Sequence, residues 1–281
     1  MAKRHCFIQL NLLVMMLLTV SLQVDGATPA PTWGLPLQGA DAERFLSTAK
    51  VISMRPLKSK AVTRPKKVEL SDGSKICSAV FKTVDQYQPV KRFDNGEVEL
   101  KFTDSFEYEI AAYELDTMLG LGIVPPTVRR RINREVGSLS LWVEGAMTEW
   151  ERIEVHKKRP PDLESWNEQM YTIRLFLQLI YDTDYTNINN LLVTPDWKIY
   201  KIDSSRAFRS HLELRREGSL ERFSRRVLSS LRALDHEELK RRLRPWLTKK
   251  QIEALWVRRG LILDLADRRV AEQGEAAVLF D

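Results

Sequence analysis

The stretch LIYDTDYTNINNLLVTPDWKIYKIDSSRAF, residues 179–208, decides how this chain is interpreted. It begins at the end of an apolar segment, crosses a turn rich in Asp and Asn, and continues as two short strand candidates joined by Thr194-Pro195-Asp196. Asp184 follows the apolar segment, Asn190 directly precedes the first strand, and Asp203 follows the second. Because Asp and Asn are favoured in turns, the stretch has a purely structural interpretation as well as a chemical one.

The segments around this stretch are mainly helical in pattern. Residues 166–181, WNEQMYTIRLFLQLIY, are apolar almost all round when placed on a helix, which predicts a helix buried within a lobe. Two further helical regions are predicted over residues 219–247 and 248–272. The second of these opens with Thr248 and has Gln251 three positions later, which is a capping-box pattern.

The first half of the chain has the alternating pattern of strands instead. Residues 66–84 alternate on both sides of Asp72-Gly73, a dipeptide that supplies the positive φ of tight hairpin turns. Asp94-Asn95-Gly96 predicts a second turn. Two more strand candidates lie around Val136-Gly137, at residues 128–133 and 138–147.

One prominent helix interrupts these strands. Residues 104–120, DSFEYEIAAYELDTMLG, place Phe106, Ile110 and Tyr113 on one stripe. Asp104 or Ser105 is a good N-cap, and glycine ends the segment. A short amphipathic helix is also predicted before Val51. The fold class that follows is α+β: a small antiparallel sheet with one main helix, then a mainly helical part.

The N-terminus has the pattern of a secretory signal. Residues 1–26 run from Lys3 and Arg4 through an apolar core to small residues at the end, which predicts a signal peptide and an extracytoplasmic protein, secreted or periplasmic. Left uncleaved, residues 7–24 are just long enough to anchor the chain in a membrane. Residues 27–39 are rich in proline and predict a linker.

Composition excludes several classes of protein. The 281 residues are 43% hydrophobic and 29% charged, which is the composition of a globular chain and not of a disordered one. Lys and Arg number 44 against 38 Asp and Glu, a net charge of +6. Since the basic residues alternate with acidic ones along most of the chain, we expect no nucleic-acid partner, whereas an anionic small substrate remains compatible.

The sequence predicts no metal site built from cysteine or histidine residues. Cys6 lies within the predicted signal, so Cys77 is the one thiol of the mature chain and no internal disulfide is expected. Cys77 sits in an alternating apolar segment and is best interpreted as a small core residue. The tryptophans are likewise expected to pack in the core or between lobes rather than to stack on a ligand.

A lysine and a glutamate precede the Asp and Asn residues in a chemically meaningful order. Lys82 ends the apolar strand candidate AVFK, residues 79–82, and Glu109 lies on the helix over residues 104–120. Phosphoryl transfer from a nucleotide needs backbone amides over the phosphates, a cation held by a carboxylate, a carboxylate base and metal ligands. A surface role for Lys82, and Glu107 or Glu114 as its partner, remain alternatives.

Four segments of this chain resemble a known family. LSDGSKICSAVFK, YEIAAYELDTMLGLGIVPPTV, GSLSLWVEGAM and the 179–208 stretch look like a bacterial family of mostly uncharacterised proteins with a phosphatidylinositol 3- and 4-kinase-like catalytic fold. They are more distantly similar to HipA-like kinases and to the secretory-pathway kinases of animals. The resemblance covers about residues 55–265. It implies a two-lobed, protein-kinase-like fold with an N-lobe over residues 40–147 and a C-lobe over residues 148–281.

The resemblance also implies an atypical kinase that uses ATP and Mg²⁺. Lys82 would contact the nucleotide phosphates with Glu109 as its partner, Asp184 would be the catalytic base, and Asn190 with Asp203 would hold the metal. Two further nucleotide contacts are implied. A turn that covers the phosphates would be formed by Ser71, Gly73 and Ser74, and a hinge that contacts the adenine would include Val143, Gly145 and Met147. The acceptor would be a hydroxyl on a protein, glycan or lipid.

The spacing in the catalytic stretch leaves two questions open. Family members place the metal-binding Asn five residues after the catalytic Asp, a spacing that Asn189 has, whereas Asn190 is six residues away. We prefer Asn190, because it directly precedes an apolar strand that determines the direction of its side chain. The altered spacing also permits a second interpretation, a catalytically weak pseudokinase that acts as an extracytoplasmic binding or scaffold protein.

Overall fold

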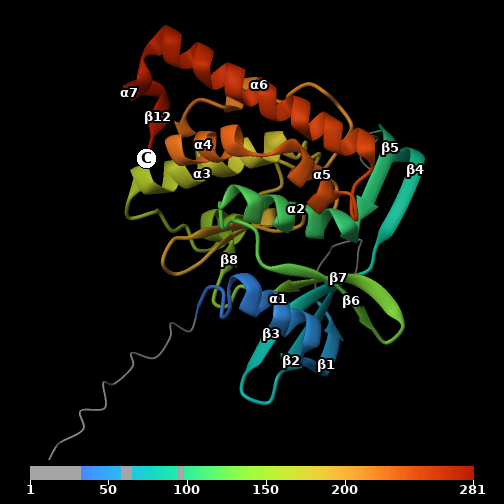
Figure 1. The fold of residues 1–281 in the computed structure, drawn as a ribbon. Coiled ribbons are helices and arrows are strands. Elements are labelled where there is room, and N and C mark those ends of the chain that lie inside the picture. Colours follow the sequence, from blue (N-terminus) through green and yellow to red (C-terminus); the bar gives the residue numbers. More distant parts are fainter. Residues whose placement is uncertain (1–32, 58–64, 94–95, 97) are drawn as a thin grey trace, which may run out of the picture. The chain divides into compact units, whose positions relative to one another are not determined.

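The first half of the described chain is built on an antiparallel sheet (Figure 1). The computed structural model describes residues 33–57, 65–93, 96 and 98–281. The strand order is β1-β2-β3-β7-β6. The bounds of these strands are β1 Lys50–Pro56, β2 Lys66–Ser71, β3 Ile76–Lys82, β6 Thr127–Ile132 and β7 Glu135–Leu141. The predicted hairpin through Asp72-Gly73 is confirmed, since β2 and β3 pair across it.

The core of this sheet lies between its strands and helix α1 (Gly39–Thr48), which packs on β6 and β7. Alternate residues of the strands are buried against apolar residues of α1, as the pattern predicted. The members of this core include Phe45, Leu46, Val68, Leu70, Cys77, Phe81, Leu139 and Leu141. Cys77 is therefore the buried core residue that its sequence context indicated.

Glycine at position 137 is required by the approach of two strands. The sequence predicted the second of two strands at residues 138–147, but β7 runs from Glu135 to Leu141, and the turn between β6 and β7 is made by Asn133 and Arg134, whose φ angles are 49° and 71°. Gly137 instead lies within β7, where an added Cβ would stand 2.1 Å from the carbonyl oxygen of Lys82. The predicted start of this strand is therefore three residues too late, because Gly137 belongs to the strand, where it serves the contact between β7 and β3.

A separate hairpin is inserted between β3 and the main helix. Its strands are β4 (Asp85–Arg92) and β5 (Val98–Ser105), which pair with each other and with no other described strand. Asp94 and Asn95 of the second predicted turn lie outside the described residues. This hairpin leads directly into α2 (Phe106–Leu119), so its last residues lie beside the start of that helix.

Helix α2 is the predicted helix, and it belongs to the larger of the two cores. The hydroxyl of Ser105 accepts a hydrogen bond from the backbone of Glu107, and Gly120 ends the helix with a φ of 63°, as its capping pattern indicated. The predicted stripe of Phe106, Ile110 and Tyr113 is buried, and further residues of α2 are buried as well, because the helix packs against the sheet and against α4 and α5. Glu109 is consequently buried.

The second half of the chain is mainly helical, as predicted. A three-stranded sheet of order β10-β9-β8 precedes the C-terminal helices and supports the 179–208 stretch. The strands are β8 Met147–Thr148, β9 Leu191–Val193 and β10 Ile199–Lys201, with β11 Phe223–Ser224 and β12 Leu279–Phe280 forming a small parallel pair. The α-helices are α3 Leu163–Leu179, α4 Arg225–Ala233, α5 His236–Leu243, α6 Lys249–Gln273 and α7 Glu275–Val278. A π-helix, Glu151–Val155, and two 3₁₀ turns, Ile188–Asn190 and Glu217–Ser219, complete the elements.

The predicted capping box at α6 is present, with Thr248 and Gln251 bonded to each other's backbone. The strands that flank Thr194-Pro195-Asp196 are also confirmed as an antiparallel pair.

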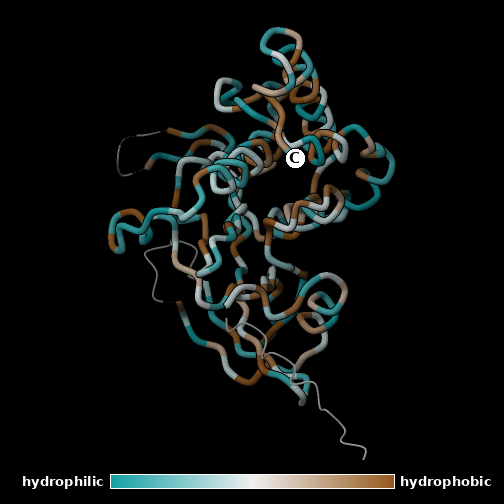
Figure 2. The backbone as a smooth tube through the Cα atoms, turned by 90° about the vertical axis from the view of Figure 1, so that its left-hand side faces the viewer, coloured by the Kyte–Doolittle hydropathy of each residue, from teal (hydrophilic) through white to brown (hydrophobic). Residues whose placement is uncertain are grey.

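The predicted signal peptide and membrane anchor lie outside the described residues, as does most of the predicted linker. Gly34, within the linker, exchanges two backbone hydrogen bonds with Glu144, each 2.8 Å long. Figure 2 shows hydrophobic and hydrophilic residues interspersed along the described helices and strands. None of the described helices combines the length and apolar character needed to span a bilayer.

We predict that Gly137→Ala lowers the free energy of unfolding by about 1–3 kcal/mol, because its Cβ would force β7 away from the backbone of Lys82. Chemical denaturation followed by circular dichroism measures this change. Gly260→Ala is the control, since Gly260 lies within α6 with nothing within 4 Å of an added Cβ. That variant should gain about 0.5–1 kcal/mol from helix propensity. Equal effects at the two positions would contradict this account.

Asp116 predicts a pH dependence of stability. Its carboxylate accepts hydrogen bonds from the backbone N–H groups of Gly122, Ile123 and Val124, at 2.9–3.2 Å. Burial raises the pKa of Asp116 to about 6 from 3.8, so its protonation favours the folded state. This contribution is complete below pH 4 and is lost as the pH rises through 6.

Relative to Asp116→Asn, which does not titrate, the wild type should lose about 3 kcal/mol of stability between pH 4 and pH 7. Urea denaturation at each pH measures this difference. A wild type and variant whose stabilities stay parallel across that range would show that Asp116 has an ordinary pKa.

Candidate functional site

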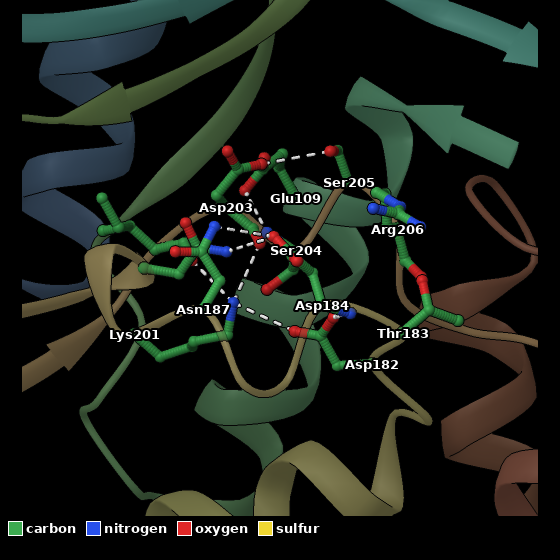
Figure 3. Close-up of polar contacts among 12 residues, drawn as sticks. Glu109, Asp182, Thr183, Asp184, Asn187, Lys201, Asp203, Ser204, Ser205 and Arg206 are labelled. Carbon is green, nitrogen blue, oxygen red and sulfur yellow. Dashed lines mark hydrogen bonds and ion pairs between the residues drawn. The ribbon is translucent and has the colours of Figure 1, made fainter. Parts of the chain in front are cut away.

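Lys82 bridges two carboxylates that come from distant parts of the chain. Its Nζ lies 2.6 Å from Glu109 Oε1 on α2 and 2.9 Å from Asp203 Oδ1 in the loop after β10. Each carboxylate has a further donor: Ser204 N to Glu109 Oε2 at 3.1 Å and Ser205 Oγ to Asp203 Oδ1 at 3.1 Å (Figure 3). Three segments that the sequence separates by up to 121 positions therefore meet at one ammonium group.

The charges of this triad influence one another strongly. Burial acts to lower the pKa of Lys82, but Asp203 and Glu109 together raise it well above its ordinary value. For Asp203, burial opposes ionisation, and the ammonium groups of Lys82 and Lys201 nevertheless hold the pKa well below its ordinary range. Burial raises the pKa of Glu109 in spite of its contact with Lys82. Lys82 and Asp203 are thus charged at neutral pH.

The other predicted glutamates on α2 face elsewhere. Glu114 pairs with Arg242 of α5, and Glu107 lies near Asp85 and Arg129, where burial raises its pKa. Glu109 is the glutamate of this helix that contacts Lys82. The sequence left open which glutamate of α2 pairs with Lys82. In the structure this residue is Glu109, because the helix directs Glu109 toward Lys82 and directs Glu107 and Glu114 elsewhere.

Asp184 lies in the turn between α3 and β9, where it accepts two side-chain hydrogen bonds. Its Oδ2 receives Nδ2 of Asn187 at 3.0 Å and Nδ2 of Asn190 at 2.9 Å. Asn190 is buried and leaves its amide oxygen free of protein donors among the described residues, whereas Asn189 is exposed and donates to Asn187. The structure thus pairs Asn190, and not Asn189, with Asp184; Asn187 was not identified from the sequence.

A second buried ion pair, Lys201 with Asp182, supports both the Asp184 turn and the Asp203 loop. Lys201 and Asp182 are 1% and 0% exposed, and Lys201 Nζ lies 3.1 Å from Asp182 Oδ2. Lys201 also donates to the carbonyl oxygens of Ile202 and Asp203, at 2.6 and 2.9 Å. Asp182 Oδ1 in turn accepts the backbone N–H of Asp184 at 2.8 Å. The pair therefore connects the Asp184 turn with the Asp203 loop (Figure 3).

The backbone at Asp203 adopts the left-handed region, with a φ of 58°. This conformation is uncommon for a residue other than glycine and persists where its surroundings impose it. Here the surroundings are the donated hydrogen bond from Lys201 to its carbonyl and the contact of Lys82 with its carboxylate.

These residues open on a hollow that we call the Lys82 cleft, of about 710 Å³. It is lined by Lys82, Glu109, Asn187, Asn190, Lys201 and Asp203 at one end. The rest of its lining is largely apolar, including Val80, Leu141, Val143, Ala146, Leu192 and Ile202. A mostly apolar hollow with a few convergent charged groups is the ordinary form of a small-molecule site.

The predicted phosphate-covering turn does not reach this cleft. Ser71 ends β2, and Gly73 and Ser74 lie in the turn before β3, whereas Lys82 ends β3 at the far end of a strand about 20 Å long. Hydrogen bonds within this turn run to Asp72 and Ser71. We do not retain the three residues as nucleotide contacts. Leu57 and Pro65, at the ends of the β1–β2 connection, line the cleft instead.

Of the predicted hinge residues, Val143 lines the cleft and the other two do not. Gly145 packs against Trp33, because an added Cβ would stand 3.0 Å from the Cβ of Trp33. Met147 pairs with Val193 in the β8–β9 ladder. Trp150 is 44% exposed at the cleft, so the prediction that it packs in the core is wrong.

One buried carboxylate near the triad was missed by the sequence interpretation. Asp104 was considered an N-cap, but the cap is Ser105, and Asp104 is 6% exposed. Its Oδ1 has no hydrogen-bond partner, and burial raises its pKa while Asp203 and Lys82 act on it from nearby. An unpartnered buried carboxylate oxygen beside Asp203 is a ligand that a cation would satisfy.

A second hollow lies on the other side of Asp184. This Asp184 cavity, of about 1230 Å³, shares no lining residue with the Lys82 cleft. Its lining comes from the β4–β5 hairpin, the segment 206–215 and the first turn of α6. Asp184 itself lines the cavity, while its Oδ2 is bonded to Asn187 and Asn190 of the cleft. The carboxylate therefore stands where the two hollows meet.

Comparisons with known proteins show the fold of this chain. No protein-family model and no curated protein matches the sequence, so the resemblance to a particular bacterial family receives no support.

Among solved structures, hydra Fam20 with sugar is 17% identical and matches 84% of this chain and 90% of its own, with a TM-score of 0.58. The Golgi casein kinase is 14% identical, with 85% and 78% covered and a TM-score of 0.57. The Helicobacter pylori proinflammatory kinase CtkA is 10% identical, with 81% and 98% covered, and its TM-score of 0.49 is too low to bear on the fold. The chain has the two-lobed α+β kinase-like fold.

We predict that Lys201→Met destabilises the protein by about 3–5 kcal/mol, because it leaves the Asp182 carboxylate buried without a counter-charge. The double variant Lys201→Met/Asp182→Leu should recover a large part of this loss, which a double-mutant cycle in urea measures. The exposed pair Glu238 and Arg241 serves as the control and should show little coupling. A Lys201 variant as stable as wild type would show that the buried pair carries no structural role.

Proposed function

We propose that this chain is a kinase that transfers the terminal phosphoryl group of ATP to a hydroxyl group. The observation that carries the proposal is the Lys82 ammonium held between Glu109 and Asp203 inside a largely apolar cleft. A lysine fixed in this way by a helix glutamate is what phosphate positioning in a kinase requires. The kinase-like fold supports the assignment.

The donor nucleotide would occupy the Lys82 cleft. The apolar lining suits a purine base, and Lys82 suits the phosphates. Val143 lies in the connection between β7 and β8, where the hinge was predicted, so we propose it as a contact of the base. The exposed ring of Trp150 is a further surface on which a base can stack.

The acceptor would approach from the Asp184 cavity. Asp184 would take the proton of the acceptor hydroxyl as the oxygen forms a bond to the terminal phosphorus, and the bond from that phosphorus to the bridging oxygen would break, releasing ADP. Its two amide donors, Asn187 and Asn190, hold the carboxylate in one orientation.

The residues present fit a magnesium ion. Among the described residues, no three His, Cys, Asp or Glu side chains gather as an all-protein metal site. Magnesium is ordinarily held by one or two carboxylates together with phosphate oxygens, and Asp203, the unpartnered oxygen of Asp104 and the amide oxygen of Asn190 supply this chemistry. Bound there, the ion would neutralise the charge of the phosphates.

A pseudokinase remains the second candidate. The observation that favours it is the six-residue interval between Asp184 and Asn190, which a 3₁₀ turn at Ile188–Asn190 accommodates. In this case the protein acts as an extracytoplasmic binding or scaffold protein with weak or no phosphoryl transfer. The two secretory-pathway structures and the N-terminal pattern support an extracytoplasmic location for either candidate.

Thermal unfolding with and without ATP and Mg²⁺ tests the nucleotide site. A saturating ligand at 100 times its dissociation constant stabilises the folded state by about 2.7 kcal/mol. We expect a shift in wild type that requires Mg²⁺ and is lost in Asp203→Ala. No shift with any nucleotide would refute the kinase and favour the scaffold protein.

Asp184→Asn separates the two candidates. This variant should keep the Mg-dependent shift and lose ADP release by at least a hundredfold, because the general base is removed. The same basal ADP release in wild type and variant would favour the pseudokinase.

A further inference from the structure

The Asp184 cavity carries an excess of positive charge. Lys101 of β5, Arg215 of the segment before the 3₁₀ turn Glu217–Ser219, and Lys250 of α6 line it. Within the described part of the chain, none of the three lies within 4 Å of a carboxylate, so no ion pair recorded there neutralises them. Cationic side chains that line one cavity without acidic partners favour the binding of an anionic ligand there.

The acidic residues of the cavity do not offset this charge. Glu99 forms ion pairs with both Arg206 and Arg209, so these three side chains carry a net charge of +1. Asp184 is held by the uncharged amides of Asn187 and Asn190. The lining therefore contains five cationic side chains and two carboxylates, a formal excess of three positive charges.

One of these cations is placed close to the proposed base. The guanidinium of Arg215 lies 4.9 Å from the ring centre of Tyr185, the residue that directly follows Asp184, and 5.9 Å from that of Tyr181. Contact with aromatic faces restrains a guanidinium that is otherwise exposed. An anionic group bound by Arg215 would consequently bring its own molecule next to the Asp184 carboxylate.

The form of the site favours a compact ligand. The unpaired cations surround a single cavity of about 1230 Å³ instead of following one strand, as the recognition of an extended acidic peptide would require. Exposed apolar side chains of the hairpin, Tyr87 and Leu100, form part of the wall at 61% and 70% exposure. Such a mixed wall accepts the carbon skeleton of a small molecule.

We propose that the acceptor is a small soluble molecule that bears an anionic group, a phosphate or a carboxylate, beside the hydroxyl that receives the phosphoryl group. Arg215, Lys101 and Lys250 bind the anion, and Asp184 faces the hydroxyl. This inference rests on the proposed function, because it identifies the substrate class of the same reaction.

Matched pairs of compounds test the site by isothermal calorimetry on the full chain. Glycerol 3-phosphate is compared with glycerol, and glucuronate with glucose, so that the phosphate and carboxylate sources of the anion are separated. Each titration is repeated with saturating ADP and Mg²⁺ and in Lys82→Ala, which removes binding at the Lys82 cleft from the signal. We expect the charged member of at least one pair to bind at least tenfold more tightly, and to weaken as salt is added.

Charge-removing variants locate the binding. Arg215→Gln and Lys101→Gln should each weaken the charged probe about tenfold, whereas Arg131→Gln, an exposed arginine of β6 outside both hollows, should not. Equal binding of charged and neutral probes, or variants that bind like wild type, would overturn the proposal. An acidic heptapeptide that binds more tightly than every small probe would overturn it in favour of a protein acceptor.

The proposal and the proposed function fail in different ways. Loss of the Mg-dependent ATP shift refutes the kinase assignment, whatever the anion probes show. An intact ATP shift together with no preference for the charged probes refutes only the anionic acceptor.

Discussion

The contact of Lys82 with Glu109 and Asp203 is the interaction on which the rest of this structure depends. It joins the last residue of β3, the buried face of α2 and the loop after β10, so it holds the sheet, the main helix and the helical part together at one point. An ammonium group this poorly exposed would be costly without partners. Each of its two carboxylates also has a second donor, which keeps the whole group satisfied.

The buried pair of Lys201 and Asp182 extends the same constraint to the Asp184 turn. Lys201 holds the carbonyl of Asp203, and Asp182 holds the backbone of Asp184. Lys201 N also donates to the carbonyl of Ile123, in the loop that Asp116 anchors to α2. The geometry of the proposed base and that of the proposed metal ligand are consequently coupled through buried charges, which cannot rearrange without losing their partners.

Much of the fold was predictable because periodicity reports burial directly. The hairpin of β2 and β3, the helix α2, the buried helix α3 and the capping box of α6 were all recognisable from local patterns. The late start predicted for the strand at residues 138–147 has a different origin, since Gly137 within β7 is required by the approach of Lys82 from another strand. A requirement imposed by a distant backbone atom leaves no local pattern.

The candidate site was predictable in part for a related reason. Lys82, Glu109, Asp184, Asn190 and Asp203 stood out because their order matches a known chemistry, and the structure brings them together. Ser71, Gly73 and Ser74 were misplaced, because adjacency to Lys82 in sequence becomes about 20 Å along an extended strand. Asp104, Asp182 and Lys201 were missed, since nothing in the sequence distinguishes a charged residue that will be buried from one on the surface.

The sequence by itself determined the identity of the elements, the order of the reactive side chains and the core position of Cys77, because these follow from local spacing and residue type. Only the tertiary structure decided which glutamate of α2 meets Lys82, which asparagine joins Asp184, and that two separate hollows meet at that carboxylate. These outcomes depend on the packing of α2 between the sheet and α4 and α5, and on the path of the chain after β10, neither of which is encoded in any single segment.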